Sequence, residues 1–399
     1  MVGGVCQSAL PSELRGGGCA AVSWRVSPPR FNAALTRLGH LAILSANVDL
    51  PLRRKRKFSC RSEHSIRLWA QPCAGTRPSH PSGPSNTSSF PRPSQGSEEA
   101  HCTDPSVASG IGNCSALVGE VRSALPGRPC QDVLNFRGNG PEDARLLPLG
   151  ESTALVVYND YAPKPAGGPL SFRRTIYVSE LSVSWRESRI VGQLGRPVRL
   201  SGAQTSFALG DIEKNWSPFS RDVKGRMQTF VHRWIDRAGQ AIVHQLDVRS
   251  GELRGDIVSS NGKLRQVVGG PPHTTLSGGT PAVRLNKSHF VAIGHTMTMP
   301  CELPTVAAKG PDAKLQCLKR NQWRAYALFG YLFESEPPFR LVAATPQFRI
   351  VPPTGTRNRA CNFGPPPPEV TRPSGTVYGL LGKPQFPVGL VLHATVQDM

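Results

Sequence analysis

The sequence predicts an all-β protein, and three features of the chain after about residue 135 carry that prediction. Short apolar runs, most of them five to nine residues long, alternate with clusters of Gly, Pro, Asn and Asp. The runs are rich in Val, Ile, Phe, Tyr and Thr, residues that fit the pleated surface of a sheet. No long helical period competes with them. Strands spaced roughly ten residues apart fit a sandwich, a barrel or a propeller.

The expected strands follow one another with a turn signal after each. In chain order the runs are ARLLPL (144–149), TALVVYND (153–160), RTIYVSEL (174–181), RMQTFVHRWI (226–235), QAIVHQLDV (240–248), AVRLNKSHFVAIGHT (282–296), WRAYALFGYLFE (323–334) and FRLVAATPQFRIV (339–351). Their even spacing favours antiparallel pairing of neighbours in the chain.

The rest of the chain differs in texture from this half. Residues 1–130 show no sustained period, and 78–97 are of low complexity, so we expect a disordered or targeting segment there. Residues 131–351 form the expected β core. Residues 352–384 are rich in proline, which removes ladder donors, and are expected to be an irregular insertion. Residues 385–399 contain one further expected strand, QFPVGLVLHATV (385–396), with the last blade cut short.

The formal net charge of +20 admits several partners but selects none. No motif typical of nucleic-acid-binding domains accompanies the charge, so no nucleic acid partner is expected. No apolar run reaches the length of a transmembrane helix, so no integral membrane segment is expected. The run RRKRK (53–57) fits a solvated charge run, a nuclear signal or a juxtamembrane cluster. The Arg- and Ser-rich N-terminus and three N-x-[ST] sequons leave localisation open between an organelle and the secretory pathway.

The ten cysteines do not suggest a metal or redox site, because no pair shows CxxC spacing. Cys301 and Cys317 could close a loop in an oxidising compartment. No cofactor and no metal are expected.

Acidic residues mark the first candidate site. Glu142 and Asp143 lie in GPEDAR (140–145) at the opening of a strand, and Asp160 ends the next strand in VVYND (156–160). Carboxylates placed in this way can act as acid or stabilise charge during sugar chemistry. The alternative is structural: Glu142 pairs with Arg145, and Asp160 caps a turn.

Basic residues mark the second candidate site, in EKNWSPF (213–219) and VHRW (231–234). Lysine binds phosphate as a point charge, and arginine binds oxyanions with two parallel hydrogen bonds. The alternative is surface charge with the tryptophan in the core. The residues singled out here are Lys214, Asn215, Trp216, His232 and Arg233.

A glycine-rich segment, SGGTPAVRL (277–285), precedes VAIGHT (291–296), in which His295 ends an apolar strand. The glycines permit close approach of the backbone to a ligand or a tight turn. A lone histidine in such a strand is more often a core residue than a ligand. The segment ESEPPFRL (334–341) suggests no chemistry by itself.

The order of these segments resembles that of the five-bladed β-propeller glycosidases and phosphorylases. It is most similar to glycoside hydrolase family 130, the β-mannoside phosphorylases, together with related β-mannosyltransferase-type proteins. The resemblance covers residues 138–350 and 385–396, and Ala144 replaces the proline of the family's EDPR element. It implies a five-bladed propeller, incomplete at one or both ends.

The resemblance also implies roles for the residues. Asp160 corresponds to the proton donor, and Asp143 would bind sugar hydroxyls or stabilise positive charge. Glu142, Arg145, Asn215 and Trp216 fall at substrate-binding positions. The positions implied to surround phosphate are those of Lys214, His232, Arg233 and His295.

The implied function is transfer of a glycosyl unit, expected to be mannosyl, between a β-linked glycan and phosphate or an activated donor. The partners would be an oligosaccharide and inorganic phosphate or a sugar nucleotide. Such chemistry needs one acid near the leaving oxygen and a cationic cradle for the anion. A hydrolase would need a second carboxylate instead, for which Glu213 is the candidate. The alternative is an inactive propeller that binds glycans or acts as a scaffold.

Overall fold

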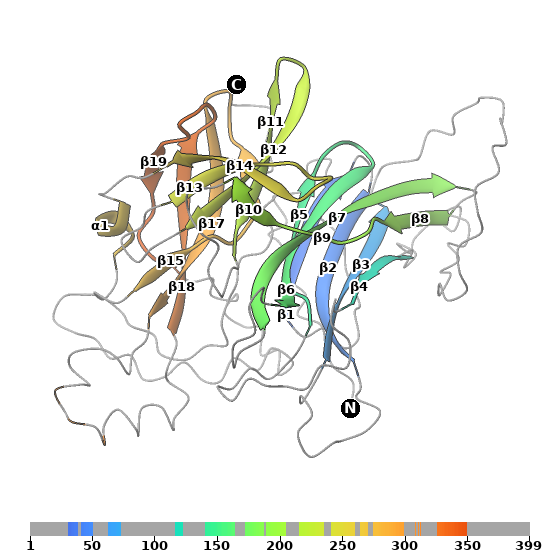
Figure 1. Cartoon of the computed structure of the whole chain (residues 1–399), viewed down its shortest axis with the longest axis horizontal. Helices are drawn as coiled ribbons and strands as arrows, with labels where there is room; N and C mark the ends of the chain where they lie inside the picture. The colour runs from blue at the N-terminus through green and yellow to red at the C-terminus, as the bar shows by residue number, and fades with distance from the viewer. Residues whose placement is uncertain are drawn as a thin grey trace, which may run out of the picture.

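The computed structural model describes the β-rich parts of the chain. The described residues are 31–38, 41–50, 63–72, 116–122, 140–163, 172–186, 189–204, 215–234, 241–259, 264–269, 274–298 and 325–348, with single residues 308, 310 and 312. These residues form four sheets, which we name A to D in chain order, and one helix of five residues (Figure 1). The all-β prediction is therefore confirmed.

Each sheet collects consecutive segments of the chain. Sheet A contains β1 (Phe31–Leu38), β2 (Leu41–Leu50), β3 (Glu63–Pro72) and β4 (Ala116–Val121). Sheet B contains β5 (Glu142–Pro148), β6 (Thr153–Pro163), β7 (Phe172–Arg186), β8 (Arg189–Leu194) and β9 (Val198–Arg199). Sheet C contains β10 (Ser201–Gln204), β11 (Ser217–Val223), β12 (Arg226–Trp234), β13 (Ala241–Leu246) and β14 (Glu252–Val258). Sheet D contains β15 (Thr275–Ser277), β16 (Val283–Arg284), β17 (His289–Thr298), β18 (Ala325–Glu334) and β19 (Leu341–Ala344), and α1 (Leu264–Val268) precedes it.

Among the described strands every pair within a sheet is antiparallel except one, and most pairs join neighbours in the chain. The exception is β10, which pairs parallel with β14 and so joins sheet C directly after β9 has paired with β7 of sheet B. One residue, Leu200, separates these two strands. The chain therefore passes from one sheet to the next without a long crossover.

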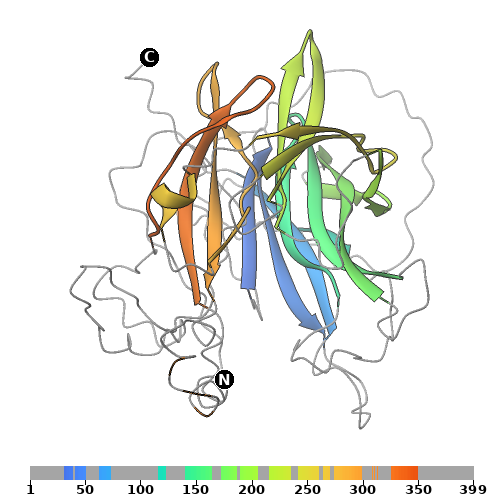
Figure 2. The same ribbon diagram turned by 60° about the vertical axis from the view of Figure 1, so that its left-hand side comes forward.

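The sheets pack face to face in chain order, which gives a propeller-like arrangement (Figures 1 and 2). Along β6, Val156 and Tyr158 enter a core shared with sheet A, whereas Leu155 and Val157 enter a core shared with sheet C. Successive residues of a strand point to opposite faces, so sheet B is buried on both sides. Sheet C is buried in the same way. The third core joins C to D and contains Phe219, Phe230, Phe290, Phe329, Phe333 and Phe339.

The N-terminal third requires a correction. We expected residues 1–130 to be disordered, yet β1 to β4 form a four-stranded sheet within them. Ile43, Ile66 and Leu68 of this sheet are fully buried against sheet B. A Cβ at Gly192 of β8 would lie 2.2 Å from the Val118 carbonyl oxygen of β4, so the two sheets approach closely at that glycine. The sequence prediction missed these strands because a basic run separates β2 from β3 and a long turn-rich segment separates β3 from β4.

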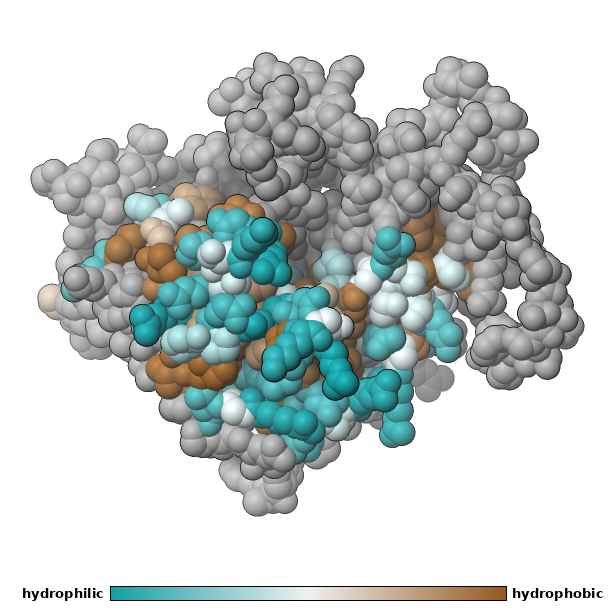
Figure 3. All heavy atoms as spheres, turned by 90° about the horizontal axis from the view of Figure 1, so that it is seen from above, coloured by the Kyte–Doolittle hydropathy of each residue, from teal (hydrophilic) through white to brown (hydrophobic). Residues whose placement is uncertain are grey.

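Several predicted features lie outside the described residues. These are the proline-rich insertion 352–384, the strand 385–396, the basic run 53–57, the pair Cys301/Cys317, and Glu213 with Lys214. Within the described part of the chain no helix is long and apolar enough to cross a membrane. On the face seen in Figure 3, hydrophobic residues show among hydrophilic ones rather than as one continuous patch.

Candidate functional site

A bulge at the start of β5 sets the position of the first acidic residues. Glu142 pairs with Asn159 and Arg145 pairs with Val157, so β5 carries one more residue than β6 between these pairs. Asp143 lies in this bulge with a φ of 57°. Asp tolerates this left-handed conformation better than most residues. Bulges commonly re-aim side chains at binding sites, and this one buries the Asp143 carboxylate.

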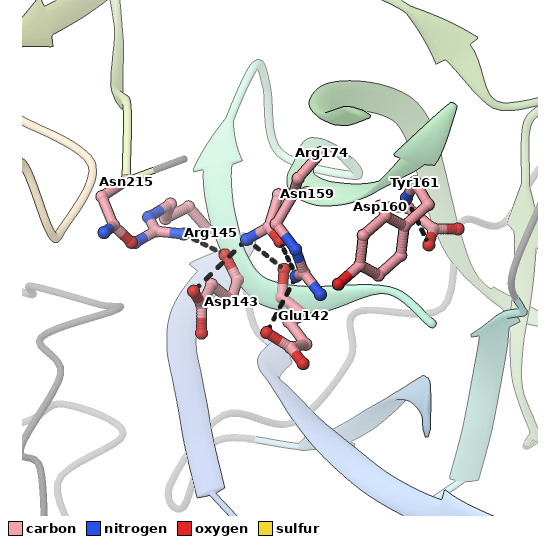
Figure 4. Close-up of polar contacts among 8 residues, drawn as sticks. All are labelled: Glu142, Asp143, Arg145, Asn159, Asp160, Tyr161, Arg174 and Asn215. Carbon is pink, nitrogen blue, oxygen red and sulfur yellow. Dashed lines mark hydrogen bonds and ion pairs between the residues drawn. The ribbon is translucent and has the colours of Figure 1, made fainter. Parts of the chain in front are cut away.

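Arg145 connects three sheets at this point, and Figure 4 shows its contacts with Asp143 and Asn215. Its Nε donates to the Gly279 carbonyl oxygen at 2.7 Å, and its Nη2 donates to Asn215 Oδ1 at 2.9 Å. Its Nη1 donates to the Asp143 carbonyl oxygen. Gly279 lies between β15 and β16 of sheet D, and Asn215 precedes β11 of sheet C. Burial lowers the pKa of Arg145, and the charge of Asp143 opposes that change.

Asn215 and His295 extend the cluster. Asn215 has a φ of 63°, and a Cβ at Gly278 would lie 2.3 Å from its carbonyl oxygen, so only glycine fits there. Arg145 occupies the Asn215 amide oxygen, and therefore Asn215 Nδ2 faces His295 Nε2, at 3.4 Å. Because Nδ2 can only donate, Nε2 must accept, which requires a neutral His295 ring in this contact.

Ser217 and Tyr331 hold the glycine segment from the other side. The Gly279 amide donates to Ser217 Oγ at 3.2 Å, and the Tyr331 hydroxyl donates to the same oxygen at 3.0 Å. Burial raises the pKa of the Tyr331 phenol to about 12, which keeps it protonated as a donor. The Gly279 peptide is thus fixed at both ends, by Ser217 and by Arg145.

A second set of contacts connects Asp143 on β5 to β6 and β7 of the same sheet. Asn159 Nδ2 donates to Asp143 Oδ2 at 3.2 Å and to the Glu142 carbonyl oxygen at 3.1 Å. Arg174 Nη1 donates to Asn159 Oδ1 and forms an ion pair with Glu142 Oε2 at 2.8 Å. The Arg174 guanidinium carbon lies 4.5 Å from the centre of the Tyr161 ring.

The electrostatics of Arg174 reflect those neighbours. Burial disfavours its charge, but Glu142, Tyr161 and Asp143 outweigh burial and raise its pKa. Arg174 is therefore a permanent cation at this position.

Asp160, the residue implied to be the proton donor, lies apart from these contacts. Its Oδ1 accepts from the Tyr161 amide at 2.7 Å, and Figure 4 shows it beside Tyr161 and away from Asp143. Asn159 and Asp160 are adjacent on β6 and so point to opposite faces. Asp160 also acts electrostatically on Tyr158, which belongs to the core shared with sheet A; burial, aided by that charge, raises the pKa of Tyr158.

The two basic residues of β12 separate in the same way. Arg233 lies on the side of the B–C core, with its guanidinium carbon 5.4 Å from the centre of the Trp216 ring. His232 lies on the side of the C–D core, where its ring stacks on Phe333 with centroids 5.4 Å apart. Burial lowers the pKa of His232 to about 3. The expectation of a cationic, phosphate-facing His232 is corrected, because a neutral ring among aromatic side chains cannot supply charge to an anion.

Trp216 is too deeply buried to serve as a platform for a substrate. Its side chain is 2% exposed and belongs to the core between sheets B and C. Its ring packs beside the Arg233 guanidinium, and Trp216 directly follows Asn215 in the chain. Lys214 lies outside the described residues, so the structure does not place it.

The structure thus brings together Asp143, Arg145, Asn215 and His295 of the predicted residues, with Glu142 at their edge. It adds residues that the sequence did not single out, namely Asn159, Arg174, Ser217 and Tyr331, and it places Gly279 of the expected glycine segment in the cluster. Asn159 could have been predicted from the sequence, because strand alternation places it on the face opposite to that of Asp160. Among the described residues no group of three or more His, Cys, Asp or Glu could hold a metal ion.

Comparisons with known proteins give only distant likenesses. No protein-family model and no curated protein sequence matches the chain. A β-1,2-mannobiose phosphorylase from Listeria innocua, in complex with β-1,2-mannobiose, is 10% identical with a TM-score of 0.37, over 79% of this chain and 75% of that chain. A Trypanosoma rangeli sialidase with 2,3-difluorosialic acid is 9% identical with a TM-score of 0.30, over 80% of this chain and 55% of that one. Because these TM-scores are low, we base no inference on them.

Proposed function

We propose that this chain is a carbohydrate-active propeller enzyme that transfers a glycosyl unit between a β-linked glycan and phosphate or an activated donor. Mannose is the first sugar to test, on the motif order described above. The proposed fold is a five-bladed propeller, of which sheets A to D are four blades. One observation carries the proposal: Asp143, Arg145, Asn215 and His295 come from three sheets into one buried hydrogen-bonded cluster.

Such a cluster suits sugar chemistry because it combines a carboxylate with fixed donors and acceptors. In the proposal Asp143 stabilises the positive charge that develops on the sugar ring or transfers a proton to the leaving oxygen. Glu142, whose side chain is 25% exposed, binds sugar hydroxyls at the edge of the cluster. Asp160 is the competing acid and is tested beside Asp143.

The anion site is the less developed part of the proposal. Of the four residues implied to surround phosphate, His295 contacts the cluster and Arg233 lies on its side of sheet C. We assign these two, with Lys214, to the anion and leave His232 out. His295, whose ring is neutral in its contact with Asn215, would bind the anion as a hydrogen-bond donor and not as a charge.

The test uses the full chain, since sheet A buries one face of sheet B. Phosphate consumption and sugar 1-phosphate release are measured with a panel of β-mannosides, and transfer is measured with GDP-mannose. We expect Asp143→Asn to lower turnover by roughly 100-fold or more, the usual scale for an acid or base. Asp222→Asn, in the exposed turn between β11 and β12, is the matched control and should leave turnover unchanged.

A second candidate function is a glycan-binding or scaffold propeller without turnover. One observation favours it: three donor groups of Arg145 bond to acceptors of the protein itself, as expected of a residue with a structural role. Under this alternative calorimetry detects glycan binding but no variant and no donor gives turnover. If Asp160→Asn abolishes turnover while Asp143→Asn does not, the acid is reassigned to Asp160.

A further inference from the structure

Arg174 carries an inference beyond the residues named in the proposed function. Its side chain is 6% exposed, comes from β7, and contacts two groups of the cluster at once. Nη1 donates to Asn159 Oδ1 and lies 2.8 Å from Glu142 Oε2. Arg174 itself makes no hydrogen bond to Asp143 among the contacts of the described residues.

The contact with Asn159 fixes which way that carboxamide faces. Arginine can only donate, so the group that meets Nη1 must be the carboxamide oxygen. The amide nitrogen then faces Asp143 Oδ2 at 3.2 Å and the Glu142 carbonyl oxygen at 3.1 Å, both of which can accept. All three groups agree with one orientation of Asn159, and the flipped orientation would set donor against donor and oxygen against oxygen.

Asp143 is where this orientation matters. It lies in the β5 bulge at a left-handed φ, so its carboxylate needs partners to hold one rotamer in place. A donor facing Oδ2 fixes the plane of the carboxyl group, whereas a carboxamide oxygen there would repel it.

We propose that Arg174 is a positioning residue, which orients the Asp143 carboxylate through Asn159 and holds Glu142 at the edge of the site. The catalytic consequence rests on the proposed function, but the orientation of Asn159 does not. The chain offers a matched control in Arg221, which forms an Arg–Glu ion pair with Glu336 at 2.5 Å on the outer hairpin, away from the cluster.

The first arm of the test observes Asn159 directly. The full chain is labelled with ¹⁵N-asparagine, and the side-chain amide signals that vanish in Asn159→Leu are assigned to Asn159. In Arg174→Met we expect hydrogen exchange at Nδ2 to accelerate about tenfold, because the carboxamide is free to turn away from its acceptors. Glu142→Gln, which keeps the Arg174–Asn159 contact, and Arg221→Met should leave the exchange rate unchanged.

The second arm measures steady-state kinetics once a turned-over glycan is known. A positioning role predicts that Arg174→Met lowers kcat about tenfold or more while KM changes by less than about threefold. Arg174→Lys should recover part of kcat, because lysine keeps the charge but lacks the planar fork. This conservative variant also serves if Arg174→Met does not fold.

The two arms separate the two proposals. Unchanged amide exchange in Arg174→Met overturns the positioning inference, whether or not the chain turns over any glycan. Faster exchange in a protein with no turnover supports the orientation of Asn159 and counts against the proposed function alone. Faster exchange with unchanged kcat overturns the catalytic part of the inference.

Discussion

The neutral His232 in the C–D core leads to a specific expectation for stability against pH. The ring is fully buried, stacks on Phe333 and lies edge-on to Trp234 at 5.3 Å between centroids. Neither ring nitrogen has a hydrogen-bond partner among the described residues. A proton on this ring would place an unpaired charge inside an aromatic core, so burial lowers the pKa from 6.5 to about 3.

The size and direction of the effect follow from that difference. Between pH 6.5 and 3 the unfolded chain binds a proton at His232 that the folded chain does not, so the free energy of unfolding falls on acidification. The contribution is fully present above pH 6.5 and is lost at about 1.4 kcal/mol per pH unit as the pH falls toward 3. At pH 4.5, two units below the unfolded pKa, the loss from this one residue is about 3 kcal/mol.

Replacement by phenylalanine removes the titrating group and keeps an aromatic ring in place. Phenylalanine is the larger side chain, so stability at neutral pH is not the test. The measured quantity is the free energy of unfolding in urea at several pH values from 7.5 to 4.5. We expect the difference between the native chain and His232→Phe to move by about 3 kcal/mol in favour of the variant over that range.

A second histidine variant controls for general acid effects. His289 begins β17 and is partly exposed, so His289→Phe should keep the pH dependence of the native chain. If the difference between the native chain and His232→Phe stays constant from pH 7.5 to 4.5, the placement of His232 in an apolar core is refuted.

Three further perturbations test other parts of the fold. Arg145→Met removes the donor from three buried acceptors and should lower the free energy of unfolding, measured in urea, by about 3 kcal/mol or more. Arg221→Met, in the hairpin of β11 and β12, should lower it by less than about 1 kcal/mol. Gly278→Ala places a Cβ 2.3 Å from the Asn215 carbonyl oxygen and should destabilise the chain and weaken glycan binding, whereas Gly150→Ala, with no atom within 4 Å, should do neither in calorimetry. Deletion of residues 1–130 uncovers the sheet B side of the A–B core and should give an aggregated chain on size-exclusion chromatography; a monodisperse, cooperatively unfolding product would contradict the packing of sheet A on sheet B.

The sequence predicted most strands of sheets B, C and D because apolar and polar residues alternate along them and turn residues bound them. It failed for sheet A, where a turn-rich segment of more than forty residues separates β3 from β4. Local patterns do not show which strands pair across such a segment. The four-sheet order therefore could not be read from local patterns, although Ile66 and Leu68 carry the alternation of a half-buried strand.

The candidate site was predicted in part for a related reason. Sequence motifs gather residues that are adjacent in the chain, but a strand sends adjacent residues to opposite faces. The motif around residue 160 points to Asp160, but the side chain that faces the cluster is that of Asn159. The motif VHRW likewise joins His232 and Arg233, although the two side chains enter different cores. The pairing of strands, such as that of Glu142 with Asn159, decides which face of the sheet a side chain occupies. This pairing joins residues far apart in the chain and is not visible in a local motif.

The cluster is both a structural tie and a candidate reaction site, and these two roles are compatible. A site that stabilises developing charge works best when its donors and acceptors are fixed before the substrate arrives, because no reorganisation is then needed during the reaction. Arg145 supplies that rigidity by bonding acceptors from three sheets, and the bulge at Asp143 presents a carboxylate to the same place. Asn159 and, through it, a permanent cation at Arg174 hold the Asp143 carboxylate in a fixed position, as a reaction site of this kind requires. The presence of that second layer is why we rank the enzyme above the scaffold.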